Sequence, residues 1–217
     1  MFLRSLFLSS CLLASASAQV ATPLFNGKDL SGWTTSDGKP VTAGWVVEPG
    51  GILHRAAKGG DLFTASEYGN FELSWEWKIS PGGNSGLKYR VQAYPEKGFL
   101  GCEYQILDDL NHPDGKIGPH RQTAALYDIL PPSPSKPLLP VGQWNLSKVV
   151  VKDQTFEHWL NGQKVLAVDL TSDVFKTARA QSKFKAAVGF AENPKGRIMI
   201  QDHQDEAWFR HITLKPL

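Results

Sequence analysis

The sequence predicts an all-β protein folded as a β-sandwich or jelly roll, and two kinds of signal lead to this prediction. First, apolar and polar residues alternate with a period of two along many short segments, which is typical of half-buried antiparallel strands. Second, turn signals rich in glycine and proline separate these segments at short intervals. The chain has 217 residues, enough for one such domain with a sizeable core. No internal repeat or linker divides it, so we expect a single domain over residues 19–217.

The first half of this domain contains a hairpin and a long alternating strand. Residues 44–48 and 52–55 flank the turn Pro49-Gly50-Gly51 and are predicted to pair. Residues 71–79 alternate over their whole length, and we expect their apolar face to be buried. That face carries Phe71, Leu73, Trp75, Trp77 and Ile79.

Two more strands are predicted after the turn at residues 81–84. Residues 87–92 alternate, so the side chains of Lys88, Arg90 and Gln92 are expected on the face opposite Leu87, Tyr89 and Val91. Residues 101–109 form a strand-like run that places an acid, Glu103, and an amide, Gln105, on one face.

The second half of the chain continues the pattern. The pair Asn161-Gly162 is a strong type I′ hairpin signal and joins the runs 155–160 and 163–168. Further strands are predicted over residues 144–151, 185–190, 196–200 and 208–214. Only residues 173–182 have a helix-like composition, and the proline-rich residues 131–137 indicate a stiff surface loop.

Residues 1–18 are predicted to be a signal peptide. A short positive segment ending at Arg4 precedes an apolar run, and Ala16-Ser17-Ala18 is an A-x-A cleavage site. The run is too short to span a bilayer, so we expect an exported protein, periplasmic or extracellular, rather than an integral membrane protein. The alternative is lipidation at Cys11, because residues 8–11 resemble a lipobox.

Composition argues against several classes of partner and site. The formal net charge is only +2 and no run of like charges occurs, which argues against nucleic acid. Cys102 would be the only cysteine left after cleavage, and we expect it to be a buried small hydrophobe. No local metal motif is present. A divalent metal is still possible, because ligands from distant strands, for example Glu103 with His203, would leave no local signature.

Polar residues of neighbouring strands could line a groove on one face of the sandwich. The corner after residue 200 holds an amide, a carboxylate and an imidazole in a row, where a simple turn would favour glycine or proline. The structural alternative is that outward charges on strands are merely solvated. The candidates are Glu76, Lys88, Arg90, Glu103, Gln105, Asp108, His112, Gln201, Asp202 and His203.

Several stretches, taken together in chain order, resemble the 3-keto-disaccharide hydrolase domain family, which has a concanavalin A-like jelly-roll fold. They are residues 24–33, 60–64, 71–77, 83–90, 101–108, 144–145, 158–162, 201–203 and 209–210. One departure occurs near the end, where the family often has Arg-Asn-Ile and this chain has Arg210-His211-Ile212.

The resemblance implies a substrate class and a set of roles. It implies a glycoside oxidised to a ketone at carbon 3, from which a base removes the hydrogen on carbon 2 and the glycosidic oxygen then leaves; water addition completes a net hydrolysis. The base would be Glu103 or His203, and Arg90 or Lys88, or a divalent metal, would stabilise the enolate. The expected substrate contacts are Lys88, Gln105, Asp108, Gln201, Asp202 and Glu76.

Two non-enzymatic alternatives share the predicted fold, because fold does not determine function. One is a carbohydrate-binding, lectin-like module, and the other is a secreted interaction module. A binding module needs aromatic platforms and amides, whereas an enzyme of the implied kind needs a positioned base beside a cation. The polar cluster around Glu103 therefore separates these readings.

Overall fold

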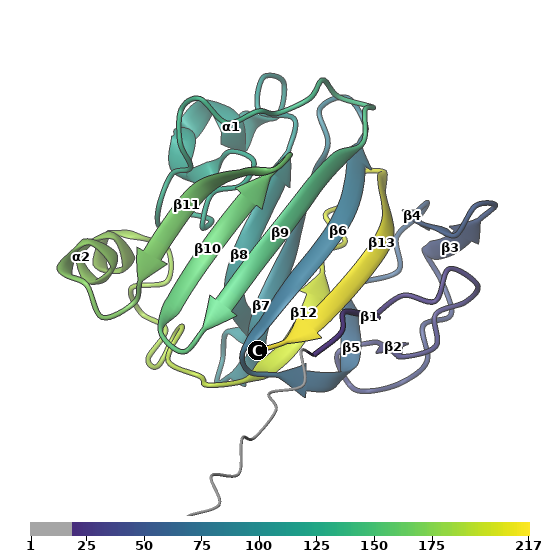
Figure 1. The fold of residues 1–217 in the computed structure, drawn as a ribbon, viewed down its shortest axis with the longest axis horizontal. Coiled ribbons are helices and arrows are strands. Elements are labelled where there is room, and N and C mark those ends of the chain that lie inside the picture. The colour runs from purple at the N-terminus through teal and green to yellow at the C-terminus, as the bar shows by residue number, and fades with distance from the viewer. Residues whose placement is uncertain (1–18) are drawn as a thin grey trace, which may run out of the picture.

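The computed structural model describes residues 19–217, which form two packed antiparallel sheets (Figure 1). The predicted signal peptide lies outside these residues. The first sheet, sheet A, has the order β11-β10-β9-β6-β13-β4-β3, with β1 paired to β13; the second, sheet B, has the order β2-β5-β12-β7-β8. Sheet A consists of β1 (Thr22–Pro23), β3 (Trp45–Glu48), β4 (Ile52–Arg55), β6 (Phe71–Ile79), β9 (Asn145–Lys152), β10 (Thr155–Leu160), β11 (Gln163–Asp169) and β13 (Ala207–Pro216). Sheet B consists of β2 (Trp33–Thr34), β5 (Leu62–Tyr68), β7 (Asn84–Tyr94), β8 (Gly98–Leu107) and β12 (Gly196–Ile200).

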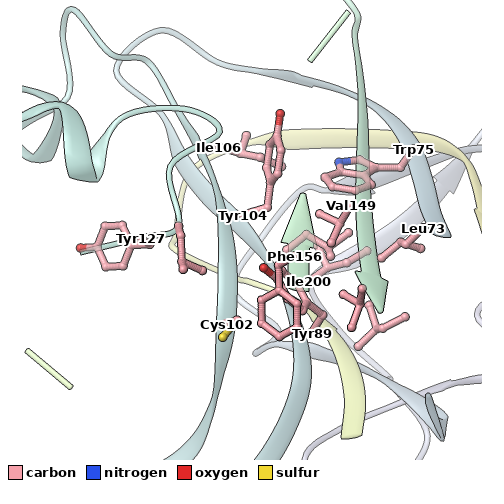
Figure 2. Close-up of a cluster of buried hydrophobic side chains, with 14 of the residues drawn as sticks. Leu73, Trp75, Tyr89, Cys102, Tyr104, Ile106, Tyr127, Val149, Phe156 and Ile200 are labelled. Atoms are coloured by element: carbon pink, nitrogen blue, oxygen red, sulfur yellow. The ribbon is translucent and has the colours of Figure 1, made fainter. Parts of the chain in front are cut away.

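The core fills the space between the two sheets, as the alternation predicts. The apolar face of β6 is buried throughout, with Trp75 fully inaccessible. The Trp75 ring meets the Tyr104 ring of sheet B edge-on, with the ring centres 5.0 Å apart, and Figure 2 shows the two among the packed side chains. Such aromatic pairs add about 0.5–1.5 kcal/mol beyond the area they bury. Cys102 is buried and unpaired, as expected.

Helix is confined to the connections between strands. The helix expected over residues 173–182 is α2 (Asp173–Gln181), which begins where the Ser172 hydroxyl accepts a hydrogen bond from the Phe175 N–H. The connection from β8 to β9 contains α1 (Pro113–Ile117) and the 3₁₀ helix η1 (Pro119–Arg121). No helix in the described part of the chain has the length and apolar character needed to cross a bilayer.

One predicted strand is wrong. Residues 185–190 form successive turns, with the Ala187 N–H donating to the Phe184 carbonyl and the Phe190 N–H to the Ala187 carbonyl. The three residues are buried at a spacing of three, which is the spacing of a turn and not of a strand. The Phe184 and Phe190 rings stack with centres 4.2 Å apart, so core packing decides the local structure.

A buried histidine makes the fold sensitive to acid. His158 is inaccessible; its Nδ1 lies 2.9 Å from the Ala124 carbonyl and its Nε2 lies 2.9 Å from the Tyr89 hydroxyl. One neutral tautomer satisfies both contacts, with Nδ1–H donating and Nε2 accepting. Burial lowers the pKa of His158 from 6.5 to about 4.

We therefore expect the free energy of unfolding to fall as the pH drops from about 6.5 to about 4. In that window the unfolded chain takes up a proton that the folded chain does not, so acid favours unfolding, by up to about 3 kcal/mol for this group. Urea unfolding of the native protein and of His158→Gln across the window measures the difference in slope. Equal slopes in both proteins would show that another group is responsible.

Candidate active site

A row of side chains crosses the face of sheet B that points away from the core. The strand pairing places Phe63 of β5, Met199 of β12, Lys88 of β7 and Glu103 of β8 opposite one another in succession. Phe63 and Met199 belong to a small apolar cluster separate from the main core. The row therefore runs from an apolar end to a charged end, a mixture that is typical of small-molecule sites.

Glu103 is the unusual member of this row. Its side chain is only 3% exposed, and the nearest cationic group is the Lys88 ammonium, at 3.7 Å from Oε2. Within residues 19–217 no hydrogen bond to its carboxylate is found. A buried carboxylate normally accepts several hydrogen bonds, so Glu103 has free capacity to take up a proton or bind a ligand group.

Gly86 makes room for this carboxylate. Glycine at this position leaves the backbone of β7 bare where the Glu103 side chain crosses it, and a β-carbon there would overlap Oε1 of Glu103. The glycine of the motif Asn84-Ser85-Gly86 therefore leaves space for the Glu103 side chain between β7 and β8.

We expect Gly86→Ala to lower activity much more than stability. The methyl group must displace the Glu103 carboxylate, which is the end of a flexible side chain, so the backbone has little reason to move. A misplaced catalytic group costs on the order of 100-fold in rate. Steady-state kinetics and thermal unfolding of the variant measure both effects, and a variant with full activity would contradict the assigned position of the carboxylate.

Asp61 borders the site from the opposite strand. It directly precedes β5, and its Oδ1 accepts a hydrogen bond from the Asp202 N–H at 2.9 Å. Burial raises the pKa of Asp61, against the opposing effects of that hydrogen bond and of the Lys88 charge. A carboxyl group of this kind holds its proton to higher pH and is suited to donate it.

The far border of the site is built by the segment that follows η1. Tyr127 donates its backbone N–H to the Glu103 carbonyl, and its hydroxyl donates to Asp114 at 2.6 Å. Burial and the neighbouring Asp114 raise the pKa of the Tyr127 hydroxyl. The Lys183 ammonium lies 4.1 Å from the centre of the Tyr127 ring, which adds a second cation at the Glu103 end of the row.

The predicted His203 lies at one end of the site, in a cluster with the nearby Asp205 and with His112 from a distant loop. Ligating atoms of His112, His203 and Asp205 all lie within 4.8 Å of one another. His203 Nε2 is 3.5 Å from the Asn84 amide nitrogen, and the buried Gln105 donates to Asn84 Oδ1 at 3.4 Å. This cluster connects to the Glu103 row through β7 and β8.

Two predicted residues are not brought to this site. Arg90 was expected on the face of Lys88, but a β-bulge follows Tyr89 and Arg90 has φ of 50°, which breaks the alternation. Its guanidinium instead donates to the Gly69 and Asp153 carbonyls and to the Asn70 side chain. Glu76 belongs to sheet A, where it accepts hydrogen bonds from Arg210 and contacts His211.

The carboxylates of two other predicted residues, Asp108 and Asp202, accept hydrogen bonds that hold loops in place. Asp108 accepts from the backbone N–H groups of Gly82, Leu110 and Asn111. Burial opposes ionisation at Asp108, but these bonds outweigh it and hold its pKa below the usual value. Asp108 therefore holds together the loops that contain Gly82, Leu110 and Asn111.

Asp202 accepts from Arg55 Nε at 2.6 Å and from the Gly59 and Gly60 N–H groups at 2.8 Å. Burial again opposes ionisation, and the hydrogen bonds, led by that from Gly59, lower the pKa of Asp202. This carboxylate therefore holds the loop before β5 and so positions Asp61. Gln201 is half-exposed and is anchored to β7 through its backbone, with its N–H donating to the Gly86 carbonyl.

The sequence reasoning missed Asp61, Asn84, Tyr127, Lys183 and Asp205 as site residues. Asp61 and Asn84 each lie beside glycine in stretches already noted, and that was the available signal. No sequence signal pointed to Lys183, because a lysine next to a turn is ordinarily solvated.

A separate hollow of about 520 Å³ opens beside the loop at residues 138–143. Its lining is mostly apolar and includes Trp77, Leu107 and Asp108, but none of the residues around Glu103. The apolar hollow and the Glu103 row are therefore separate places. We assign the site to the Glu103 row, because a carboxylate beside an ammonium can transfer protons and an apolar lining cannot.

Comparisons with known proteins agree on one family. The family model described as the 3-keto-alpha-glucoside-1,2-lyase-like domain matches residues 20–215. A Bacteroides thetaiotaomicron protein named 3-keto-disaccharide hydrolase is 36% identical, over 89% of this chain and 77% of the relative. Two crystal structures from Parabacteroides distasonis, both of proteins provisionally described as glycosyl hydrolases, also match. One has a TM-score of 0.81 at 36% identity, covering 91% of this chain and 94% of the other. The second has a TM-score of 0.71 at 28% identity, and the match covers 91% of this chain and 100% of the other.

Proposed function

The chain belongs to the 3-keto-α-glucoside-1,2-lyase-like domain family, and on that premise we propose that it is an exported enzyme that cleaves glycosides oxidised to a ketone at carbon 3 of the sugar. The observation that carries the proposal is the Glu103 carboxylate, which is buried, free of hydrogen-bond donors in the described part of the chain, and 3.7 Å from the Lys88 ammonium. A base beside a fixed cation is the arrangement that proton abstraction next to a carbonyl needs.

The first half of the reaction is an elimination. Glu103 takes the proton from carbon 2, and the electrons of that bond pass to the carbon 3 oxygen, where Lys88 stabilises the enolate. The enolate then collapses to form a double bond between carbons 1 and 2, and the bond from carbon 1 to the glycosidic oxygen breaks. We assign Asp61 as the donor that protonates the leaving oxygen, since burial raises its pKa and it lies across Lys88 from Glu103 in the strand order.

The second half is the addition of water to the enone. Asp61, now ionised, takes a proton from water as the hydroxyl oxygen bonds to carbon 1, and the protonated Glu103 returns its proton to carbon 2. Both carboxyl groups end in their starting forms. The net reaction is hydrolysis of the glycosidic bond, with no change in the oxidation level of the sugar.

This route differs from that of a conventional glycosidase. Conventional enzymes place two carboxyl groups on either side of the glycosidic bond and pass through an oxocarbenium-like transition state, which a nearby cation would oppose. Here the candidate base has an ammonium beside it. The same pairing argues against a purely carbohydrate-binding module, in which a carboxylate that is only 3% exposed and accepts no hydrogen bond within residues 19–217 would lower stability and serve no chemistry.

The experiment that tests this function compares a 3-keto glucoside with the matching unoxidised glucoside. Both carry the same chromogenic aglycone, and release of the aglycone is followed with the purified protein. Cleavage of the 3-keto compound alone supports the proposal.

A further inference from the structure

Three residues from two loops that are far apart in the sequence bring nitrogen and oxygen donors together at one end of the site. His112 lies in the loop before α1, and His203 and Asp205 lie between β12 and β13. One possible ligand atom from each falls within 4.8 Å of the others. Around a tetrahedral ion, ligand atoms at about 2.0–2.2 Å from the metal lie about 3.3–3.6 Å from one another, so side-chain rotations would need to bring these atoms closer by at most about 1.5 Å.

The buried amides beside this cluster supply a second, independent observation. Asn84 and Gln105 are only 2% and 1% exposed, yet Oε1 of Gln105 has no hydrogen-bond partner among the described residues. Asn84 also turns a nitrogen toward His203 Nε2. Exchanging nitrogen and oxygen in both amides lets Asn84 donate to Gln105 and turns the Asn84 oxygen toward the cluster, and the Gln105 nitrogen then takes the unpartnered position.

From these observations we infer that His112, His203 and Asp205 form a binding site for a first-row divalent cation such as Zn²⁺ or Co²⁺, with the Asn84 oxygen as a further donor. Two imidazoles and one carboxylate suit these ions better than Mg²⁺ or Ca²⁺, which prefer oxygen ligands throughout. With few protein ligands, the ion would keep open positions for oxygen atoms of a ligand in the groove.

Binding would be coupled to the start of α1. His112 is the N-cap of this helix, and its Nδ1 accepts the Asp114 N–H at 3.1 Å. In the neutral ring the proton therefore resides on Nε2. An ion at Nε2 would move that proton to Nδ1, and an ion at Nδ1 would replace the N–H, so either mode breaks this bond. The free energy lost with one helix cap is far smaller than the binding free energy of a transition-metal site.

The test measures metal binding directly. Untagged full-length protein is stripped with a chelator and titrated with Zn²⁺ by calorimetry and with Co²⁺ by visible absorption. We expect one ion per chain, and more than about 100-fold weaker binding in His203→Ala and Asp205→Asn. His112→Asn should also weaken binding while keeping a good N-cap residue, which separates ligand loss from helix loss.

His211→Ala provides the matched control, because this exposed imidazole lies on sheet A beside Glu76. It should bind the ion as the native protein does, and circular dichroism confirms that each variant is folded. Equal affinity in the native protein and in His203→Ala, or saturation by Ca²⁺ with no response to Zn²⁺, would overturn the site. Since the readout is binding, failure here leaves the proposed elimination standing, and failure of the elimination leaves the site standing.

Discussion

Replacing Glu103 with glutamine is expected to lower kcat on a 3-keto glycoside by about 10²–10⁴-fold and to leave the fold intact. The amide has nearly the shape of the carboxylate but cannot take the proton from carbon 2. The native carboxylate accepts no hydrogen bond in residues 19–217, so the substitution breaks none there, and only its contact with Lys88 at 3.7 Å is weakened. Single-turnover and steady-state kinetics measure the loss, with thermal unfolding alongside.

Glu157→Gln is the matched control for this variant. Glu157 lies on sheet A, where it accepts hydrogen bonds from Lys164 and Trp159, so activity should be unchanged. If Glu103→Gln retains near-native turnover while remaining folded, the carboxylate is structural. His203 then becomes the leading candidate for the base.

The second large effect concerns the substrate. The protein should cleave a 3-keto glucoside and leave the unoxidised glucoside intact, with a difference set by the acidity of the hydrogen on carbon 2. Without the adjacent carbonyl, this hydrogen is far too weakly acidic for a carboxylate to remove, and Lys88 has no enolate to stabilise. Release of a common aglycone from both compounds gives the ratio of kcat/KM. Equal cleavage of both would favour a conventional hydrolase.

The alternation of apolar and polar residues predicts most of the sandwich. Residues 71–79 match β6 at both ends, and the Asn161-Gly162 turn joins β10 and β11 as expected. These elements are predictable because burial of one strand face is a local, periodic requirement. The strand wrongly predicted at residues 185–190 shows the limit, since there the packing of Phe184 against Phe190 overrides the local pattern.

The site was only partly predictable for the same physical reason. Glu103 and Lys88 were placed correctly as neighbours because regular strands preserve the alternation up to Tyr89. The prediction put Arg90 on the wrong face because the bulge after Tyr89 turns its side chain the other way. No residue type in that segment indicates a bulge. The cluster of His112, His203 and Asp205 depends on how two loops meet, which the spacing along one chain does not encode.

The proposed elimination requires that the bond between carbon 2 and its hydrogen breaks during catalysis, and deuterium at carbon 2 of a 3-keto glucoside tests this most directly. We expect a primary kinetic isotope effect on aglycone release, or loss of the deuterium to solvent water in the product. In Glu103→Gln the residual reaction should show slower exchange as well as slower release. Full retention of deuterium in the released sugar, with no isotope effect, would contradict the elimination and the role assigned to Glu103.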